Sequence, residues 1–141
     1  MVCLRNICIN SLHKGDNDDD DNNNILTQLD YKRRHDSVAK LLHDKRALKD
    51  TLLNESTPYY KYTLSKVLEN DVACLYWDRG ILTGKTVPHN RPDITLFEKT
   101  NKIFYLIDVC LSNSGNLQTA YSEKMIKYAE LITEVKQQWQ V

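Results

Sequence analysis

RPDITLFEKTNKIFYLIDVCL, residues 91–111, is the stretch that decides the fold of this chain. It contains two short apolar runs, each typical of a β-strand, joined by a polar connection. An even-numbered loop centred between Thr100 and Asn101 predicts an antiparallel hairpin. In that hairpin Asp93, at the start of the first run, lies directly opposite Asp108, near the end of the second.

Two opposed aspartates are an unusual feature of a hairpin. Directly opposed side chains share one face and have Cβ atoms about 5 Å apart, so two carboxylates repel each other unless they share a proton or a cation. A hard divalent ion such as Mg²⁺ binds carboxylates and keeps its other positions for water and phosphate oxygens. Pro92 suits the first position of the strand because it has no N–H. Two other interpretations stay open: the aspartates merely end strands at the surface, or an odd loop keeps them apart.

A long helix is predicted from Asn116 to about Trp139, after a turn at residues 112–115. Its apolar side chains fall on one face of the helix and form a stripe. The residues of this stripe are Leu117, Tyr121, Tyr128, Leu131, Val135 and Trp139. Lys124 falls inside this stripe and Lys127 near its edge, and an ammonium in an apolar stripe either snorkels to solvent or has a functional role. Two carboxylates and an ammonium suit phosphodiester hydrolysis, in which a metal polarises the phosphate and a lysine orients water or stabilises charge.

A first helix is predicted from Ile25 to about Leu53, with an apolar stripe formed by Val38, Leu41, Leu42, Leu48 and Leu52. The chain is neutral overall, but residues 25–66 carry nine Lys or Arg and five Asp or Glu. The basic side chains either form a solvated helix face or contact phosphates. Between the two helices, residues 72–78 read as a strand.

The N-terminal segment has a different composition. Residues 16–24, DNDDDDNNN, cannot bury apolar surface, so residues 1–24 are predicted to be mostly disordered and residues 25–141 to form one domain. The expected fold class is α/β, a small mixed sheet flanked by two long helices. The four cysteines lack zinc-ligand spacing. Since no run approaches about 18 apolar residues, we expect a soluble, intracellular protein without a membrane partner.

Residues 31–139 contain several short motifs that resemble those of a known protein family. The motifs are RPD, a second aspartate after 14 intervening residues, and EKxxKY on the following helix, with RRHDSVAKLLH, YYKYTLSKVLEND and LYWDRGILT upstream. They resemble the restriction-like endonuclease domain at the C-terminus of the polyprotein of site-specific non-LTR retrotransposons. That domain is a branch of the PD-(D/E)XK nuclease superfamily, so the resemblance implies a restriction-endonuclease-like fold.

The resemblance also implies roles for single residues. Asp93 and Asp108 would bind Mg²⁺ or Mn²⁺. Cys110 stands where most of the superfamily carries its lysine, but the retrotransposon branch places the lysine on the next helix, so Lys124 and Lys127 would be catalytic. Pro92 and Tyr128 would serve as scaffold residues. The candidate nucleic-acid contacts are Arg91, His89, Lys127, Arg33 and Arg34.

The function implied is a metal-dependent DNA endonuclease that nicks its target, so that the nick primes reverse transcription in the intact element. DNA and element RNA would be the partners, and a functional copy would be nuclear. The reverse transcriptase and Cys/His zinc knuckle of the family polyproteins are not in this sequence, so we expect a fragment of such a polyprotein. The alternative is a catalytically inactive nucleic-acid-binding remnant of the same element.

Overall fold

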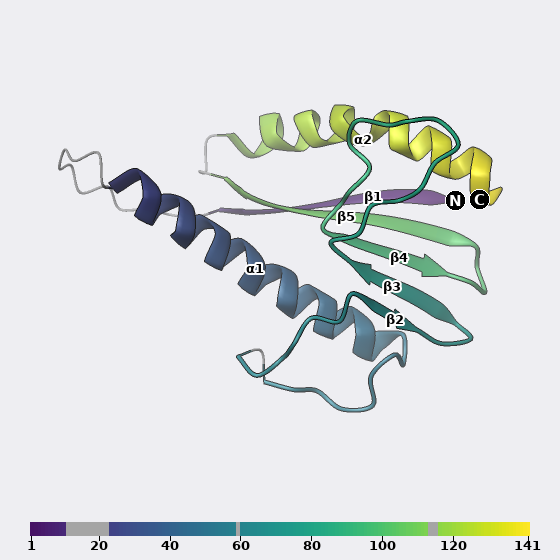
Figure 1. Cartoon of the computed structure of the whole chain (residues 1–141), viewed down its shortest axis with the longest axis horizontal. Coiled ribbons are helices and arrows are strands. Elements are labelled where there is room, and N and C mark those ends of the chain that lie inside the picture. The colour runs from purple at the N-terminus through teal and green to yellow at the C-terminus, as the bar shows by residue number, and fades with distance from the viewer. Residues whose placement is uncertain (11–22, 59, 113–115) are drawn as a thin grey trace.

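The computed structural model describes residues 1–10, 23–58, 60–112 and 116–141 of the chain. Its elements follow the order β1 (Val2–Asn10), α1 (Asn23–Lys49), β2 (Val67–Glu69), β3 (Ala73–Trp77), β4 (Ile94–Glu98), β5 (Ile103–Ser112) and α2 (Leu117–Trp139). The strands form one mixed sheet in the order β1-β5-β4-β3-β2, in which only the β1–β5 pair is parallel. The predicted α/β class, a mixed sheet with two long helices, is therefore confirmed (Figure 1).

The hairpin of β4 and β5 has the predicted register. Thr95 pairs with Leu106, and Phe97 pairs with Phe104. Side chains alternate between the faces of a strand, so Phe104, Leu106 and Asp108 point to the same face of β5. The hydrophobic core on that face also contains residues of α2, so the helix covers the face that carries Asp108.

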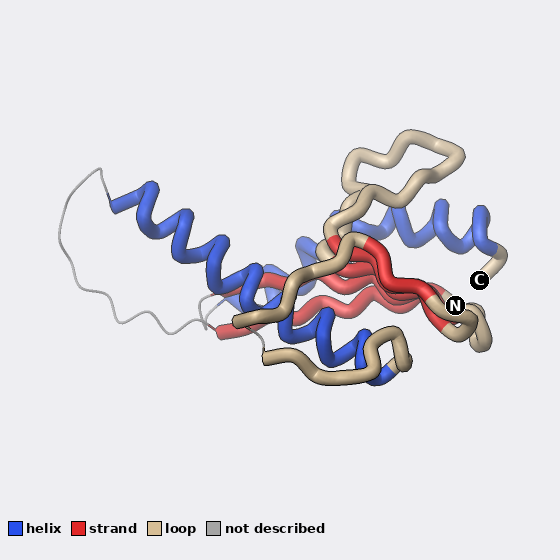
Figure 2. Tube along the Cα trace, turned by 60° about the horizontal axis from the view of Figure 1, so that its bottom comes forward, coloured by secondary structure: helices blue, strands red, loops and turns tan. Residues whose placement is uncertain are grey.

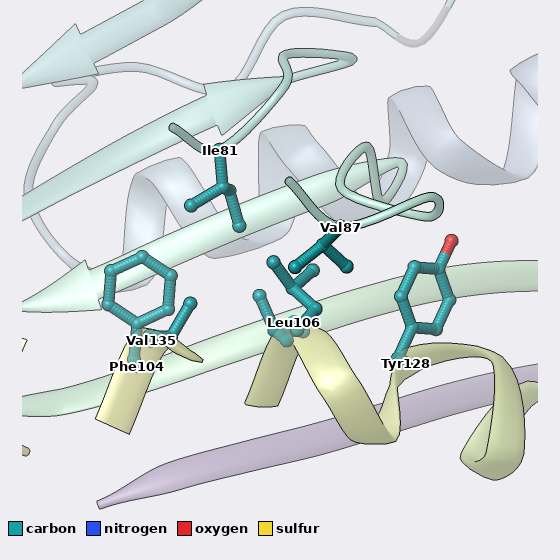
Figure 3. Close-up of a cluster of buried hydrophobic side chains, with 7 residues drawn as sticks. Ile81, Val87, Phe104, Leu106, Tyr128 and Val135 are labelled. Carbon is teal, nitrogen blue, oxygen red and sulfur yellow. The ribbon is translucent and has the colours of Figure 1, made fainter. Parts of the chain in front are cut away.

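The sheet is covered on both faces. On the α2 side, the loop between β3 and β4 arches across the molecule and adds Ile81 and Val87 to the core (Figures 1 and 2). These pack with Phe104, Leu106, Tyr128, Leu131 and Val135 (Figure 3). On the α1 side, Ala47 packs with strand residues of β3 and β4, namely Ala73, Leu75, Ile94 and Leu96. The two clusters lie on opposite sides of the sheet because Phe104 and Leu106, in the first, alternate along β5 with Tyr105 and Ile107, which pack against the second.

The predicted stripe of α2 is correct along its middle. Tyr128, Leu131 and Val135 are fully buried, while Tyr121 is 42% and Trp139 41% exposed. The Trp139 ring still packs at 5.5 Å from the Phe97 ring and 5.6 Å from the Phe104 ring, measured between centroids. The apolar stripe therefore anchors the helix through its central turns.

The predicted stripe of α1 is only partly correct: Leu42 and Leu52 pack against the core, with Leu52 beyond the end of the helix. Among the α1 side chains that the structure describes, residues 28–49, the buried ones are Ala39, His43, Asp44 and Ala47, whereas Leu41 is 47% exposed. Small alanines bring the helix backbone close to the sheet, which leaves the larger leucines at the sides. Burial lowers the pKa of His43 to about 4, so the ring is neutral, and its Nδ1 lies 2.6 Å from the Tyr62 hydroxyl. The N-terminal half of α1 extends past the sheet (Figures 1 and 2).

The N-terminal residues correct a second expectation. Instead of being disordered, Val2–Asn10 forms β1, in parallel register with residues 104–112 of β5. The Met1 carbonyl accepts a hydrogen bond from the Phe104 N–H at 2.8 Å. Residues 11–22, which include most of the acidic run, lie outside the described residues, and Asn23 already belongs to α1. Neither described helix has the length and apolar character needed to cross a membrane.

The packing of α2 on the sheet predicts how much stability is lost when one of its buried side chains is shortened. Leu131→Ala removes a fully buried side chain from the core, so we expect the free energy of unfolding to fall by about 2–5 kcal/mol. Ile126→Ala on the same helix is the matched control, because Ile126 is 78% exposed and its loss should cost less than about 0.5 kcal/mol. Urea denaturation measures both, and equal effects would contradict this packing of α2.

Candidate active site

A pocket of about 530 Å³ opens where β4 begins and β5 approaches its end. It receives side chains from α1, the strands, the loop before β4 and α2. The structure brings together there all four residues that the sequence singled out as catalytic: Asp93, Asp108, Lys124 and Lys127. The fold thus brings residues that are distant in the sequence into one cavity.

Asp108 is the most deeply placed of the four. It is only 3% exposed, and the Tyr128 hydroxyl donates a hydrogen bond to its Oδ1 at 2.6 Å. Its Oδ2 is buried without a well-aligned hydrogen bond but forms an ion pair with the Lys124 ammonium. Burial raises the pKa of Tyr128, and the bond to Asp108 raises it further, so this hydroxyl stays protonated and donates. Tyr128 and Lys124 therefore hold Asp108 from one turn of α2.

Lys124 points inward, as its place in the stripe predicted, and its side chain is 24% exposed. Burial lowers its pKa, but the hydrogen bond and charge of Asp108 more than offset this, and the net shift is upward. Lys124 is therefore a cation at neutral pH. Lys127 lies beside it: its Nζ donates to the Tyr128 hydroxyl at 3.0 Å and sits 4.7 Å above the Tyr128 ring centroid.

Asp93 directly precedes β4 and is held by backbone and side-chain donors. Because Ile94 pairs with Ile107, Asp93 comes next to residues 108–109 of β5. Its Oδ2 accepts the Val109 N–H at 2.7 Å and lies 3.1 Å from Nε2 of His35. The Asp93 side chain is 24% exposed, so the carboxylate also faces solvent.

His35 is a pocket residue that the sequence analysis missed. The hydrogen bond that its Nε2 donates to Asp93 raises the pKa of His35 to about 9 despite partial burial, so the ring carries a positive charge at neutral pH. Its Nδ1 lies 3.3 Å from Asp36 Oδ1, and Tyr31 stacks on it at 6.4 Å between ring centroids. His35 stands within the RRHDSVAKLLH motif, but nothing in the helical periodicity separates it from a solvated side chain.

The remaining predicted residues divide into two groups. Arg91 lines the pocket and forms a two-pronged contact with Asp78, at 2.7 and 2.8 Å. Pro92, beside it, is fully buried. His89 is exposed and is not part of the pocket wall. Arg33 and Arg34 both pair with Asp30 on α1 at 2.7 Å and also lie outside this pocket.

The acidic side chains of the pocket are its potential ligands for a divalent cation. Within the described part of the chain, no group of three or more His, Cys, Asp and Glu side chains gathers at metal-binding distance. Of the four aspartates that line the pocket, Asp93 and Asp108 come from the β4–β5 hairpin, and Mg²⁺ is commonly held by one or two carboxylates while water and phosphate fill its other positions. The buried Oδ2 of Asp108 is an anionic oxygen whose partner is the ammonium group of Lys124. These residues fit a hard divalent cation.

The contact between His35 and Asp93 predicts a pH dependence of stability. The folded pKa of about 9 exceeds the ordinary histidine value of 6.5, so the stabilisation is fully present below pH 6.5 and is lost as the pH rises through 9. Allowing for solvent screening, this amounts to about 1–3 kcal/mol. Urea titrations in EDTA at both ends of this range should show that loss in the wild type and not in His35→Gln. His89→Gln, an exposed control, should keep it; loss of the slope in both variants would refute the assignment.

Comparisons of the chain with protein-family models, with curated proteins and with solved structures returned no match. The case for any function therefore rests on the pocket itself, in which His35, Asp93, Asp108, Lys124 and Lys127 come together from both helices and from the central hairpin.

Proposed function

We propose that this chain is a Mg²⁺-dependent endonuclease domain that nicks DNA, of the restriction-like type found in non-LTR retrotransposon polyproteins. The observation that carries the proposal is the convergence of Asp93, Asp108 and Lys124 on one pocket. A pair of acids and an ammonium around a solvent-accessible cavity is the apparatus that phosphodiester hydrolysis needs. The EKxxKY motif supports the same reaction, because Lys124, Lys127 and Tyr128 all lie at this place.

Each residue of the pocket has a role in this proposal. Asp93 and Asp108 would hold the cation, which when bound polarises the scissile phosphate and lowers the pKa of water. Lys124, a cation at neutral pH, stabilises the negative charge that develops on the phosphate rather than accepting a proton. Tyr128 keeps the Asp108 carboxylate in one orientation, and His35 does the same for Asp93.

Lys127 and Arg91 are the proposed contacts to the DNA backbone at this pocket. Lys127 lies at the pocket wall with its ammonium beside the Tyr128 ring. Arg91 is 59% exposed in its side chain and pairs with Asp78, so a phosphate would compete with a surface carboxylate for it. In an intact element the nick would prime reverse transcription in the nucleus, with DNA as substrate and element RNA as template.

A catalytically inactive nucleic-acid-binding remnant is the second candidate. The observation that favours it is the ion pair between Lys124 and Asp108, which occupies an oxygen that a cation would need. A remnant of this kind would bind DNA through phosphate contacts alone, with strong dependence on salt and none on Mg²⁺.

Nicking of supercoiled plasmid separates the two candidates. We expect conversion to the open circle with Mg²⁺ but not with EDTA, and we expect Asp108→Asn to lower the rate at least about a hundredfold. Asp71→Asn, at an exposed position in the turn between β2 and β3, should nick at the wild-type rate. Asp93→Asn repeats the test at a less buried carboxylate. Equal nicking by wild type and both active-site variants would show that the activity is a contaminant.

The two lysines should have separable effects. Lys124→Met should lower the nicking rate at saturating DNA about 10²–10³-fold, the usual effect of losing one group that stabilises transition-state charge. Lys127→Met should mainly weaken DNA binding and reduce the slope of log affinity against log salt by about one.

Lys136→Met, at an exposed position in the last turn of α2, is the control for the loss of a charge from this helix. Nicking rates and salt titrations of DNA binding measure both effects. If Lys124→Met changed only the affinity and Lys127→Met only the rate, the two assignments would have to be exchanged.

A further inference from the structure

A second cavity, of about 330 Å³, lies on the α2 side of the sheet, away from the carboxylates. Its walls come from the loop after β3, from the three central strands and from the end of α2. Phe104 marks its position: it precedes Asp108 by four residues on β5, which places the cavity about 13 Å along the strand from the acids. The two cavities share no lining residue.

Three of the residues that line this cavity are aromatic. Tyr76, Phe104 and Trp139 line it, and the rings of Phe104 and Trp139 lie 5.6 Å apart between centroids. Trp139 is 41% exposed, so part of its indole is accessible to a bound molecule. Flat aromatic surfaces of this kind favour stacking with another flat ring.

The polar groups of the cavity are few and one of them is unsatisfied. Thr95 is 2% exposed, and its hydroxyl has no hydrogen-bond partner in the described part of the chain. A buried hydroxyl without a partner is costly, so native proteins rarely retain one without a reason. Arg79 and Gln138, both exposed, add a guanidinium and a carboxamide to the lining.

We propose that this cavity binds a planar heteroaromatic ring of the nucleobase class, which stacks on the aromatic wall and hydrogen-bonds through its edge to Thr95. A hydrocarbon would leave the Thr95 hydroxyl unsatisfied, and a phosphate alone would leave the aromatic side chains of the wall without a partner. A base combines apolar faces with a polar edge, which matches both features. The cavity is at the small end of the range for ligand pockets, about 300–1,000 Å³, so it suits one ring system.

The ring has two possible sources with the same chemistry, a free nucleoside or an unstacked base of a polynucleotide. The proposal goes beyond the nuclease function and does not depend on it, because binding here requires neither metal nor cleavage. Measurements in EDTA, repeated with Asp108→Asn, therefore give the same answer whether or not the protein cuts DNA.

Quenching of Trp139 fluorescence tests the proposal. The chain has two tryptophans, so Trp77→Phe leaves Trp139 as the single reporter. The probes are adenosine, thymidine, a thymidine hexanucleotide and a hexamer of the same charge whose residues are all abasic. We expect saturable quenching by at least one base-containing probe and none by the abasic hexamer. Quenching by the nucleosides assigns a free ligand, and quenching by the hexanucleotide alone assigns a polynucleotide.

Thr95→Val provides the sharpest variant. It removes an unsatisfied hydroxyl without changing side-chain shape, so the unfolding midpoint should stay the same or rise while the affinity for the probe falls about threefold to tenfold. Thr133→Val, an exposed site on α2 outside the cavity, should leave the affinity unchanged. Calorimetry on chains that retain Trp77 repeats the comparison. Absence of quenching by every probe, equal quenching by the abasic hexamer, or wild-type affinity in folded Thr95→Val would overturn the proposal.

Discussion

The buried carboxylate of Asp108 is the constraint on which the arrangement of this protein depends. A charge that is only 3% exposed is tolerable only when it is paired and hydrogen-bonded, and both partners of Asp108, Lys124 and Tyr128, come from α2. The helix must therefore pack with one particular turn facing the strand. A shift of α2 by a single residue would leave an uncompensated charge beneath it, so the polar contact selects one packing among those that the apolar stripe would allow.

The second acid reaches the same place by a different route. The register of the β4–β5 hairpin places Asp93 beside the end of β5, where the Val109 N–H binds its Oδ2. From the opposite face of the sheet, α1 extends past the sheet and contributes His35 to the same oxygen. Both helices thus contact the acids of one hairpin, each through a charged hydrogen bond, and the pocket forms where these layers meet.

The hairpin and the pocket lysine could be predicted from sequence because each depends on local periodicity. The alternation of side chains along a β-strand predicted which face of the sheet carries Asp108. The helical repeat predicted that Lys124 lies on the inner side of α2. β1 was missed because a parallel pairing with β5, about a hundred residues away, leaves no local signal, and because the acidic run nearby suggested disorder for the whole segment. His35 was missed because the helical repeat of α1 does not distinguish it from a solvated side chain, and its partner Asp93 lies 58 residues away in the sequence.

The Lys124 ammonium acts as an internal counter-ion to the Asp108 carboxylate. Without any bound cation, the Lys124 ammonium already neutralises the Asp108 carboxylate, so the folded chain contains no unpaired charge at this buried acid. A divalent ion that enters would exchange with the ammonium rather than fill an empty charge, and part of its binding energy would be spent on displacing it. In the proposed nuclease, folding would therefore not require the metal, and the displaced Lys124 would be available in the pocket for the substrate phosphate.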